Sequence, residues 1–254
     1  MSNDNLGDRM KKYENVSRTH LTTRTPVIIR IDGKSFHTFT RGFNRPFDDI
    51  LIKSMQETMK YLCENIQGCV LGYTQSDEIT LVLIDYQNLN TAAWFDYNIQ
   101  KCASIASSMA TMTFNKCFEQ EVLYLKFQSH SQTSPYDVAL NKGAMFDARV
   151  FNIPKEEVCN CLLWRQLDAT RNSIQMVAQS QFSHKELQGL TCDMLQEKLF
   201  AEKGINWNDY PPHYKRGSCC IKKDLENGRR KWVVDIEIPK FVNEGRKYVD
   251  DLIM

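Results

Sequence analysis

Three acidic residues lie at the ends of predicted strands, where they could hold metal ions. Asp32 ends one β-branched run, and Asp77 and Glu78 lie between two further runs. Clustered carboxylates repel one another unless a cation or a proton compensates their charge. Two Mg²⁺ ions bridged by carboxylates and a backbone carbonyl are a common arrangement for phosphoryl or nucleotidyl transfer. Taken alone, Asp32 could equally be an ordinary turn residue after a strand.

The segment that follows Asp32 could bind phosphate through its backbone. Residues 33–35 read Gly-Lys-Ser, like the end of a P-loop. A P-loop also needs an earlier glycine, separated from Gly33 by four residues, but that position is Ile28. The P-loop motif is therefore absent. Because glycine permits close backbone approach, the peptide groups after Asp32 could still surround a triphosphate.

Three further polar side chains each have two interpretations. Lys101 lies on a predicted helix and Arg45 precedes another, so either could neutralise phosphate or remain a solvated surface charge. His37 has aromatic neighbours at Phe36 and Phe39. It could be a packed, hydrogen-bonded histidine or a catalytic one.

The elements that must position these residues follow a β-α-β-β-α-β order. The strands are expected at 26–31, 69–73, 79–84 and 144–151, with helices over 48–66 and around 95–109 and irregular structure over 119–141. This is the split-βαβ or ferredoxin-like arrangement of an α+β protein. We expect an antiparallel sheet with helices on one face and the other face free for a site. Strands one and three are neighbours in this arrangement, so Asp32 should meet Asp77 and Glu78.

The remaining chain predicts a helical extension. A helix is expected over 155–181, and a capping box at 183–186 opens another that runs to Lys203. Residues 206–231 read as a loop and 232–238 as a strand. We therefore expect a catalytic domain over 1–153 and a helical, basic extension over 154–254.

Composition excludes several classes of protein. The chain has 254 residues, 42% of them hydrophobic and 25% charged, which suits a globular protein rather than a disordered one. No signal peptide or membrane-spanning run is present, and nine scattered cysteines fit reduced thiols, so we expect a cytoplasmic protein that does not contact membranes.

The net charge of +1 conceals an uneven distribution. Residues 215–231 contain seven basic and two acidic side chains, and residues 1–30 contain six basic and three acidic ones. Such regions suit a phosphate backbone, although a solvated surface loop would have the same composition.

Two motifs at a specific separation make the sequence recognisable. The segment 30–37 reads Arg-Ile-Asp-Gly-Lys-Ser-Phe-His, and the segment 73–78 reads Tyr-Thr-Gln-Ser-Asp-Glu. Together they resemble the tRNA-histidine guanylyltransferase superfamily, the 3′-to-5′ nucleotide polymerases. Further agreement extends over roughly residues 8 to 240, in segments 146–150, 164–168, 183–188, 203–207 and 215–217.

The resemblance implies a polymerase-type palm and assigns roles to the residues above. It implies two Mg²⁺ ions held by Asp32, Asp77 and the carbonyl of Gly33, with Glu78 supporting the catalytic acids. Nucleotide contacts are implied for Asp32, Gly33, Lys34, Ser35, Phe36, His37, Arg45, Ser76, Asp77 and Lys101. The family has lysine where Arg45 stands, which alters the geometry of that contact.

The implied substrates are tRNA, ATP, GTP and other nucleoside triphosphates. ATP activates the 5′-phosphate of the RNA, the 3′-hydroxyl of the incoming nucleotide then attacks that phosphate, and AMP leaves. A homotetramer, a dimer of dimers, is implied as well. Candidate tRNA contacts are Arg30, Asn172, Lys215 and Arg216.

One departure from the family pattern bears on the reaction. Eukaryotic members carry His-Ile-Asn-Asn-Leu-Tyr-Asn where residues 170–176 read Thr-Arg-Asn-Ser-Ile-Gln-Met, so only Asn172 matches. Members without that motif resemble the bacterial and archaeal enzymes, which favour template-dependent repair of a tRNA 5′ end. The alternatives are non-templated addition of G to histidine tRNA, a palm-type nucleotide cyclase, and an RNA-binding module without catalysis.

Overall fold

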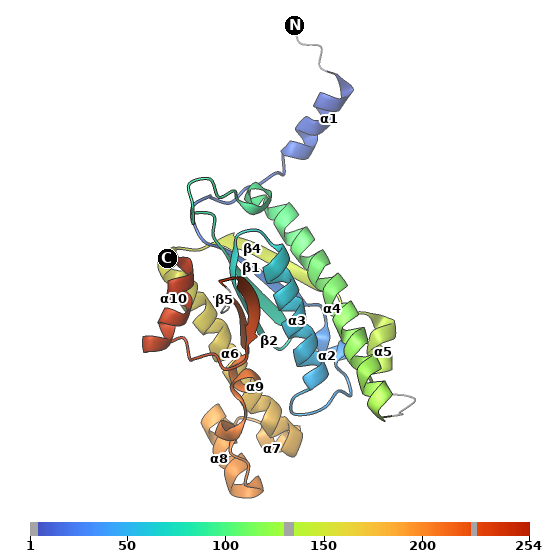
Figure 1. Cartoon of the computed structure of the whole chain (residues 1–254). Helices are drawn as coiled ribbons and strands as arrows, with labels where there is room; N and C mark the ends of the chain where they lie inside the picture. The colour runs from blue at the N-terminus through green and yellow to red at the C-terminus, as the bar shows by residue number, and fades with distance from the viewer. Residues whose placement is uncertain (1–4, 130–134, 225–227) are drawn as a thin grey trace.

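A six-stranded antiparallel sheet forms the centre of the molecule (Figure 1). The computed structural model describes residues 5–129, 135–224 and 228–254. The order across the sheet is β4-β1-β3-β2-β5-β6. The strands are β1 (Val27–Gly33), β2 (Cys69–Gln75), β3 (Glu78–Leu83), β4 (Phe146–Asn152), β5 (Ser218–Asp224) and β6 (Arg230–Asp235).

Two long helices, α3 (Asp49–Asn65) and α4 (Ile99–Ser129), cover one face of the sheet (Figure 1). Alternate residues of β1, such as Ile29 and Ile31, pack into the same apolar core as the inner sides of these helices. Successive strand residues point to opposite faces, so this core takes every second side chain. The predicted split-βαβ arrangement with palm helices on one face is confirmed.

The second face of the sheet is covered in part by α6 (Val158–Gln181) and α10 (Lys247–Ile253). Ile28 and Val82 point to this face and share a core with Leu162 and Val249. The expectation of a free second face is therefore wrong where α6 and α10 cover it. Strands that are buried on both faces read as nearly continuous apolar runs, which is the pattern of β1 and β3.

Three segments differ from their predicted structure. Residues 119–129 continue α4, because Val122 adds a further buried position to its inner side. Residues 135–142 form α5, whereas 130–134 lie outside the described residues. The predicted loop 206–231 contains β5, which pairs with β2, and its residues 225–227 are not described.

The predicted helix from the capping box to Lys203 is divided in two. The capping box of Ser183 and Glu186 is present, but it opens only the short α7 (His184–Leu187). Gly189 then adopts a φ of +80° and breaks the helix. Thr191 caps the separate α8 (Cys192–Lys203), and Gly204 ends it as expected.

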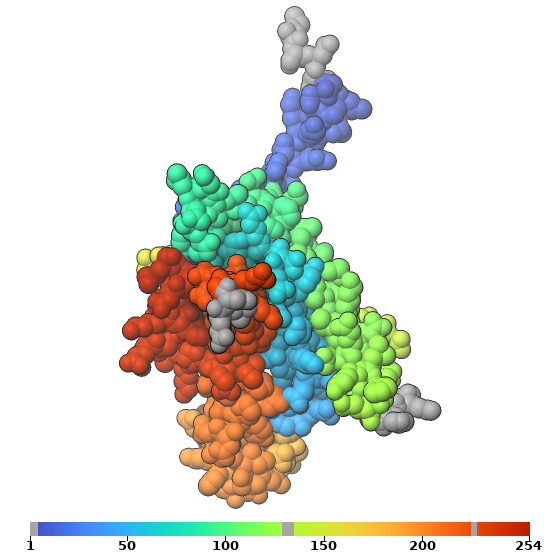
Figure 2. Space-filling view, viewed as in Figure 1, coloured from blue at the N-terminus to red at the C-terminus, as the bar shows by residue number. Residues whose placement is uncertain are grey.

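The remaining helices are short or peripheral. Figure 2 shows α1 projecting from one end of the molecule and the α8 region forming a lobe at the other. No helix in the described part of the chain is long and apolar enough to cross a membrane. The remaining bounds are α1 (Leu6–Asn15), α2 (Phe36–Phe39), η1 (Trp94–Tyr97), α5 (Pro135–Lys142), η2 (Lys155–Glu157), η3 (Trp207–Asp209), α9 (Pro212–Arg216) and η4 (Asn243–Arg246).

Candidate functional site

The acidic residues singled out in the sequence meet where β1 ends and the β2–β3 turn begins. Asp32 stands opposite Glu78 in the β1–β3 register. The backbone N–H of Gly33 donates a hydrogen bond to the carbonyl of Asp77 at 3.1 Å. The antiparallel pairing of β1 with β3 therefore places these residues at one edge of the sheet, as predicted.

Burial and carboxylate repulsion raise the pKa of both Asp32 and Asp77. Burial and the nearby carboxylate of Asp147 raise the pKa of Asp32, and the charges of Arg149, Arg30 and Arg165 only partly oppose the rise. Burial and the charge of Asp32 raise the pKa of Asp77, while a hydrogen bond from Ser76 to its Oδ1, 3.0 Å long, opposes the rise. A cation bound between the two carboxylates would relieve their repulsion.

The oxygen donors at this edge fit a Mg²⁺ ion whose remaining ligands are substrate phosphate and water. No group of three or more His, Cys, Asp or Glu side chains that could hold a metal occurs among the described residues. Mg²⁺ does not require such a cage, because it is usually held by one or two carboxylates, with substrate phosphates and water completing its octahedron. Asp32 and Asp77 supply two carboxylates at this edge, and the Gly33 carbonyl is a further oxygen donor next to Asp32 in the chain. This donor set is enough for such a site.

Glu78 is engaged in a different interaction. Its Oε1 accepts from Nε of Arg165 at 2.8 Å, and the same guanidinium donates to Asp168 at 2.8 Å. Burial raises the pKa of Glu78, and the charge of Arg165 opposes that rise. This buried ion pair ties α6 to the start of β3. The supporting role predicted for Glu78 stays a prediction.

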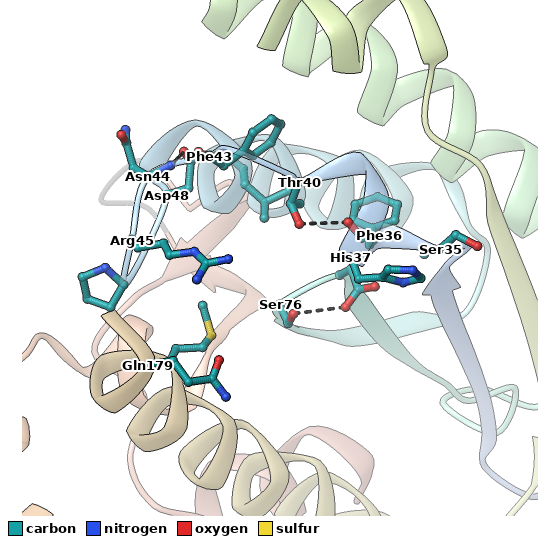
Figure 3. Close-up of a pocket in the computed structure, with 15 residues that line it drawn as sticks. Ser35, Phe36, His37, Thr40, Phe43, Asn44, Arg45, Asp48, Ser76 and Gln179 are labelled. Atoms are coloured by element: carbon teal, nitrogen blue, oxygen red, sulfur yellow. Dashed lines mark hydrogen bonds between the residues drawn. The ribbon is translucent and has the colours of Figure 1, made fainter. Parts of the chain in front are cut away.

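A cavity of about 500 Å³ opens beside Asp77. Three stretches of chain supply its walls: the segment from the end of β1 into α3, the β2–β3 turn, and α6. Figure 3 shows Arg45 reaching into it opposite Gln179 of α6. The lining residues are Gly33, Ser35, Phe36, His37, Thr40, Phe43, Asn44, Arg45, Pro46, Asp48, Leu51, Ser76, Asp77, Met176 and Gln179.

The turn after β1 is held rigidly beneath this cavity. A Cβ atom on Gly33 would lie 2.3 Å from the ring of Phe36, so only glycine fits there. That ring packs against Phe114 and Phe146 in the core. Ser35 has a φ of +55°. Left-handed residues other than glycine concentrate at functional sites, where surrounding structure holds them in place.

Three predicted nucleotide contacts lie outside the cavity wall: Asp32, Lys34 and Lys101. Lys34 is exposed, and its backbone N–H donates to the carbonyl of Met145 at 2.8 Å. Lys101 lies in the first turn of α4, where its ammonium group is 5.1 Å from the ring centre of Phe95. It lines a separate surface hollow with Arg18. Within this chain, the structure does not bring Lys101 to the cavity beside Asp77.

The predicted RNA contacts are dispersed. The Lys215 ammonium donates to the carbonyl of Asn208, and Nε of Arg216 donates to the carbonyl of Ile238 at 2.9 Å, so both cations make contacts within the fold. Asn172 lines a smaller hollow that shares Ser76 with the main cavity. The guanidinium of Arg30 lies 5.4 Å from the ring centre of Trp164.

Sequence reasoning did not assign several residues that shape the site. Asp48 is buried at the cavity wall and accepts hydrogen bonds from Leu51 N–H and Tyr136 Oη. Asp147 lies opposite Asp32 in the β1–β4 register. Asp147 lies two residues before Arg149 on an alternating strand, so the sequence could have placed both side chains on one face of the sheet. No sequence pattern marks Gln179, because only the packing of α6 brings it to the cavity.

Comparison with known proteins agrees with this geometry. A family profile described as tRNAHis guanylyltransferase matches residues 7–154. The structure of a bacterial tRNA(His) guanylyltransferase-like protein in complex with ATP superposes with a TM-score of 0.84 and 43% identity, covering 98% of this chain and 99% of that one. A complex of such a protein with GTP gives a TM-score of 0.81 and 42% identity, covering 98% of each chain.

A curated relative extends the similarity to eukaryotes. The tRNA(His) guanylyltransferase of Schizosaccharomyces pombe is 27% identical over 230 residues, which cover 85% of this chain and 80% of that protein. The profile spans more than half of the chain and includes β1, the β2–β3 turn and α3. The chain therefore belongs to the tRNA(His) guanylyltransferase family, whose members are nucleotidyltransferases.

Proposed function

We propose that this protein repairs tRNA 5′ ends by adding nucleotides in the 3′-to-5′ direction against the opposing strand as template. The observation that carries the proposal is the meeting of Asp32 with Asp77, which itself lines a cavity of about 500 Å³. Two carboxylates beside a cavity of that size suit a nucleoside triphosphate with its metal ions. The complexes of bacterial relatives with ATP and GTP support nucleotides as the ligands.

In this proposal, Asp32, Asp77 and the Gly33 carbonyl hold two Mg²⁺ ions. When bound, such ions stabilise the charge that develops on attacking and leaving oxygens. The chain itself holds the triphosphate through the peptide groups of residues 33–37, whose turn is anchored by Phe36. Arg45 reaches into the cavity, where its guanidinium can bind phosphate oxygens in a bidentate manner (Figure 3).

The chemistry consists of two displacements at phosphorus. First, an oxygen of the RNA 5′-monophosphate bonds to the α-phosphorus of ATP, and pyrophosphate leaves. Next, the 3′-hydroxyl of the incoming nucleotide bonds to the RNA 5′-phosphorus, its proton passes to solvent, and AMP leaves. The fixed turn and Arg45 align the reacting groups, and alignment supplies much of the rate in phosphoryl transfer.

The departure from the eukaryotic motif supports template-dependent addition. Residues 170–176 lie on α6, and three of them, Asn172, Ser173 and Met176, line the two hollows beside Ser76. The altered motif therefore stands at the cavity wall, where it can change how the incoming nucleotide is selected. We further propose that residues 1–153 supply the catalytic palm and that residues 154–254 supply RNA contacts.

An extension assay tests the proposal. The protein is incubated with Mg²⁺, ATP, nucleoside triphosphates and a tRNA transcript that lacks its first nucleotide, and the length of the 5′ end is followed. We expect extension only by the nucleotide that pairs with the opposing base. The variant Asp77→Ala should lose at least about a hundredfold in rate, because it removes a carboxylate that holds the metal ions in this proposal.

The control is Asp251→Ala, which removes an exposed carboxylate from α10 and should retain full activity. Undiminished extension by Asp77→Ala would overturn the assignment of the metal site. Addition of G regardless of the opposing base would indicate non-templated guanylyl transfer instead. A cyclic product formed from nucleotide alone would indicate a cyclase.

A further inference from the structure

An exposed tryptophan lies beside the candidate site on the α6 side of the sheet. The side chain of Trp164 is 54% exposed, whereas Trp94 and Trp232 are buried. Large aromatic side chains are normally buried or held in interfaces, so an indole this exposed next to a functional site suggests a binding surface. Neither the sequence motifs nor the cavity wall assigns it a role.

Two guanidinium groups hold this indole. The Cζ atom of Arg165 lies 4.4 Å from the ring centre of Trp164, and that of Arg30 lies 5.4 Å from it. Arg165 is in turn fixed by its ion pairs with Glu78 and Asp168. The indole is therefore orientated before any ligand arrives, which lowers the entropic cost of binding.

The charge around the indole favours an anionic partner. The positive charge of Arg165 is balanced by its two carboxylate partners. Arg30 acts on Asp32 and Glu78 only at longer range, because no ion pair within the described residues joins it to a carboxylate. Arg149, an exposed residue, stands opposite Arg30 in the β1–β4 register. An exposed ring beside two arginines suits a ligand that carries both an aromatic base and a phosphate.

The distance from the catalytic edge is short. Arg30 precedes Asp32 by two residues on the same strand face, a rise of about 7 Å. Successive nucleotides of a strand are about 3.4 Å apart along a helix axis. A phosphate bound by Arg30 would therefore lie within about two nucleotides of the reacting phosphate. A base on Trp164, whose ring centre is 5.4 Å from Arg30, would lie within about four.

We propose that Trp164 is a stacking platform for a nucleobase of the RNA substrate near its reacting 5′ end, with Arg30 binding the adjacent phosphate. The inference rests on the proposed function for the identity of the RNA. Stacking tolerates any base, because every base has an aromatic face. Such a platform would hold the RNA end in place while its terminal nucleotide changes at each addition.

Binding measurements without ATP test this platform separately from catalysis. The full chain is titrated with the shortened tRNA transcript at fixed salt, and Kd is measured by fluorescence anisotropy. Trp164→Ala should raise Kd by roughly 5- to 150-fold, the loss expected for one stacked base. Trp164→Phe should stay within about threefold of wild type because it keeps an aromatic ring.

The matched control is Leu167→Ala, which truncates a residue of α6 that is 60% exposed and should leave Kd unchanged. RNA should also quench tryptophan fluorescence in the wild type and quench it less in Trp164→Phe. Equal RNA affinities for Trp164→Ala and Leu167→Ala would overturn the proposal. An equal loss of ATP affinity in Trp164→Ala would also overturn it, because the platform would then serve the free nucleotide.

The two proposals can fail separately. Wild-type protein that binds RNA but does not extend it would refute the proposed repair activity, and the stacking test would still apply. Extension at the wild-type rate and with the wild-type KM for RNA in Trp164→Ala would refute the platform alone. Absence of RNA binding by the wild type would refute both.

Discussion

Asp77 combines its proposed metal-binding position with an electrostatic cost. It follows Ser76, whose φ of +50° places the backbone in the left-handed region. Burial and the charge of Asp32 both raise the pKa of its carboxyl group. Sites arranged to bind a cation are destabilising when that cation is absent, because their buried carboxylates repel one another.

The metal-free protein should therefore gain stability from Asp77→Asn. A raised pKa in the folded state means that folded protein binds more protons than unfolded protein does, so stability falls as pH rises from about 4 through the folded pKa. We expect Asp77→Asn to raise the Tm at pH 7 by about 2–4 °C, the shift for about 1 kcal/mol in a domain of this size. Thermal unfolding in EDTA between pH 5 and pH 8 measures this effect.

Asp251→Asn is the control for that measurement, and its Tm should match that of the wild type. The difference between Asp77→Asn and wild type should narrow as pH falls, since protonation then neutralises the native carboxyl group. A lower Tm for Asp77→Asn at pH 7 in EDTA would show that the carboxylate stabilises the metal-free fold.

Among the elements, the local sequence pattern predicted the strands that bring Asp32 to Asp77 but not the cavity wall formed by α6. The strands β1, β2, β3 and β4 follow from β-branched runs with turn residues between them, and antiparallel pairing then brings Asp32 to Asp77. The wall formed by α6 depends on packing against the second sheet face. Nothing in its sequence shows which strand it covers, so the ion pair between Arg165 and Glu78 could not be predicted.

Strand β5 was missed because its residues carry weak strand signals. It begins Ser-Cys-Cys-Ile at position 218 and follows Gly217, in a region whose basic residues read as a solvated loop. Gly217 has a φ of +82° and a ψ of −170°, a combination that is almost restricted to glycine. A Cβ atom there would lie 2.4 Å from the Thr74 carbonyl oxygen.

Two glycine substitutions separate close packing from backbone strain. Gly217→Ala should destabilise the protein by roughly 3 kcal/mol or more. The new methyl group would clash with the backbone of β2, and alanine would be strained at this positive φ. Gly189→Ala, with a φ of +80° and nothing within 4 Å of the new Cβ, should cost only about 1 kcal/mol. Urea denaturation of both variants measures the difference. Equal losses would show that contact with β2 does not determine the path of the chain here.

At the scale of the whole molecule, one helix surface suggests association with further copies. Exposed apolar side chains of α4 recur at spacings that place them on one side of the helix: Ile105, Met112, Leu123 and Phe127. A long helix with apolar residues on both its inner and outer sides is typical of a buried position. The homotetramer implied by the family resemblance stays a prediction.

Light scattering coupled to size exclusion tests the assembly. We expect a mass of four times the 29.6 kDa of the chain. The double variant Met112→Lys/Phe127→Lys should shift this mass toward smaller species, because it places two charges on the exposed apolar side of α4. A monomeric wild type at micromolar concentration would contradict the prediction, and an unchanged mass in the double variant would place the contact elsewhere.

The order of strands across the sheet also has a consequence for synthesis on the ribosome. β2 acquires its outer neighbour only when β5, more than 140 residues later, has been made and has paired with Leu71–Thr74. Until then, the nascent chain presents an unpaired row of main-chain N–H and C=O groups, a template for pairing with another chain. Translation that stops between α6 and β5 should therefore yield an aggregating fragment rather than a smaller active enzyme.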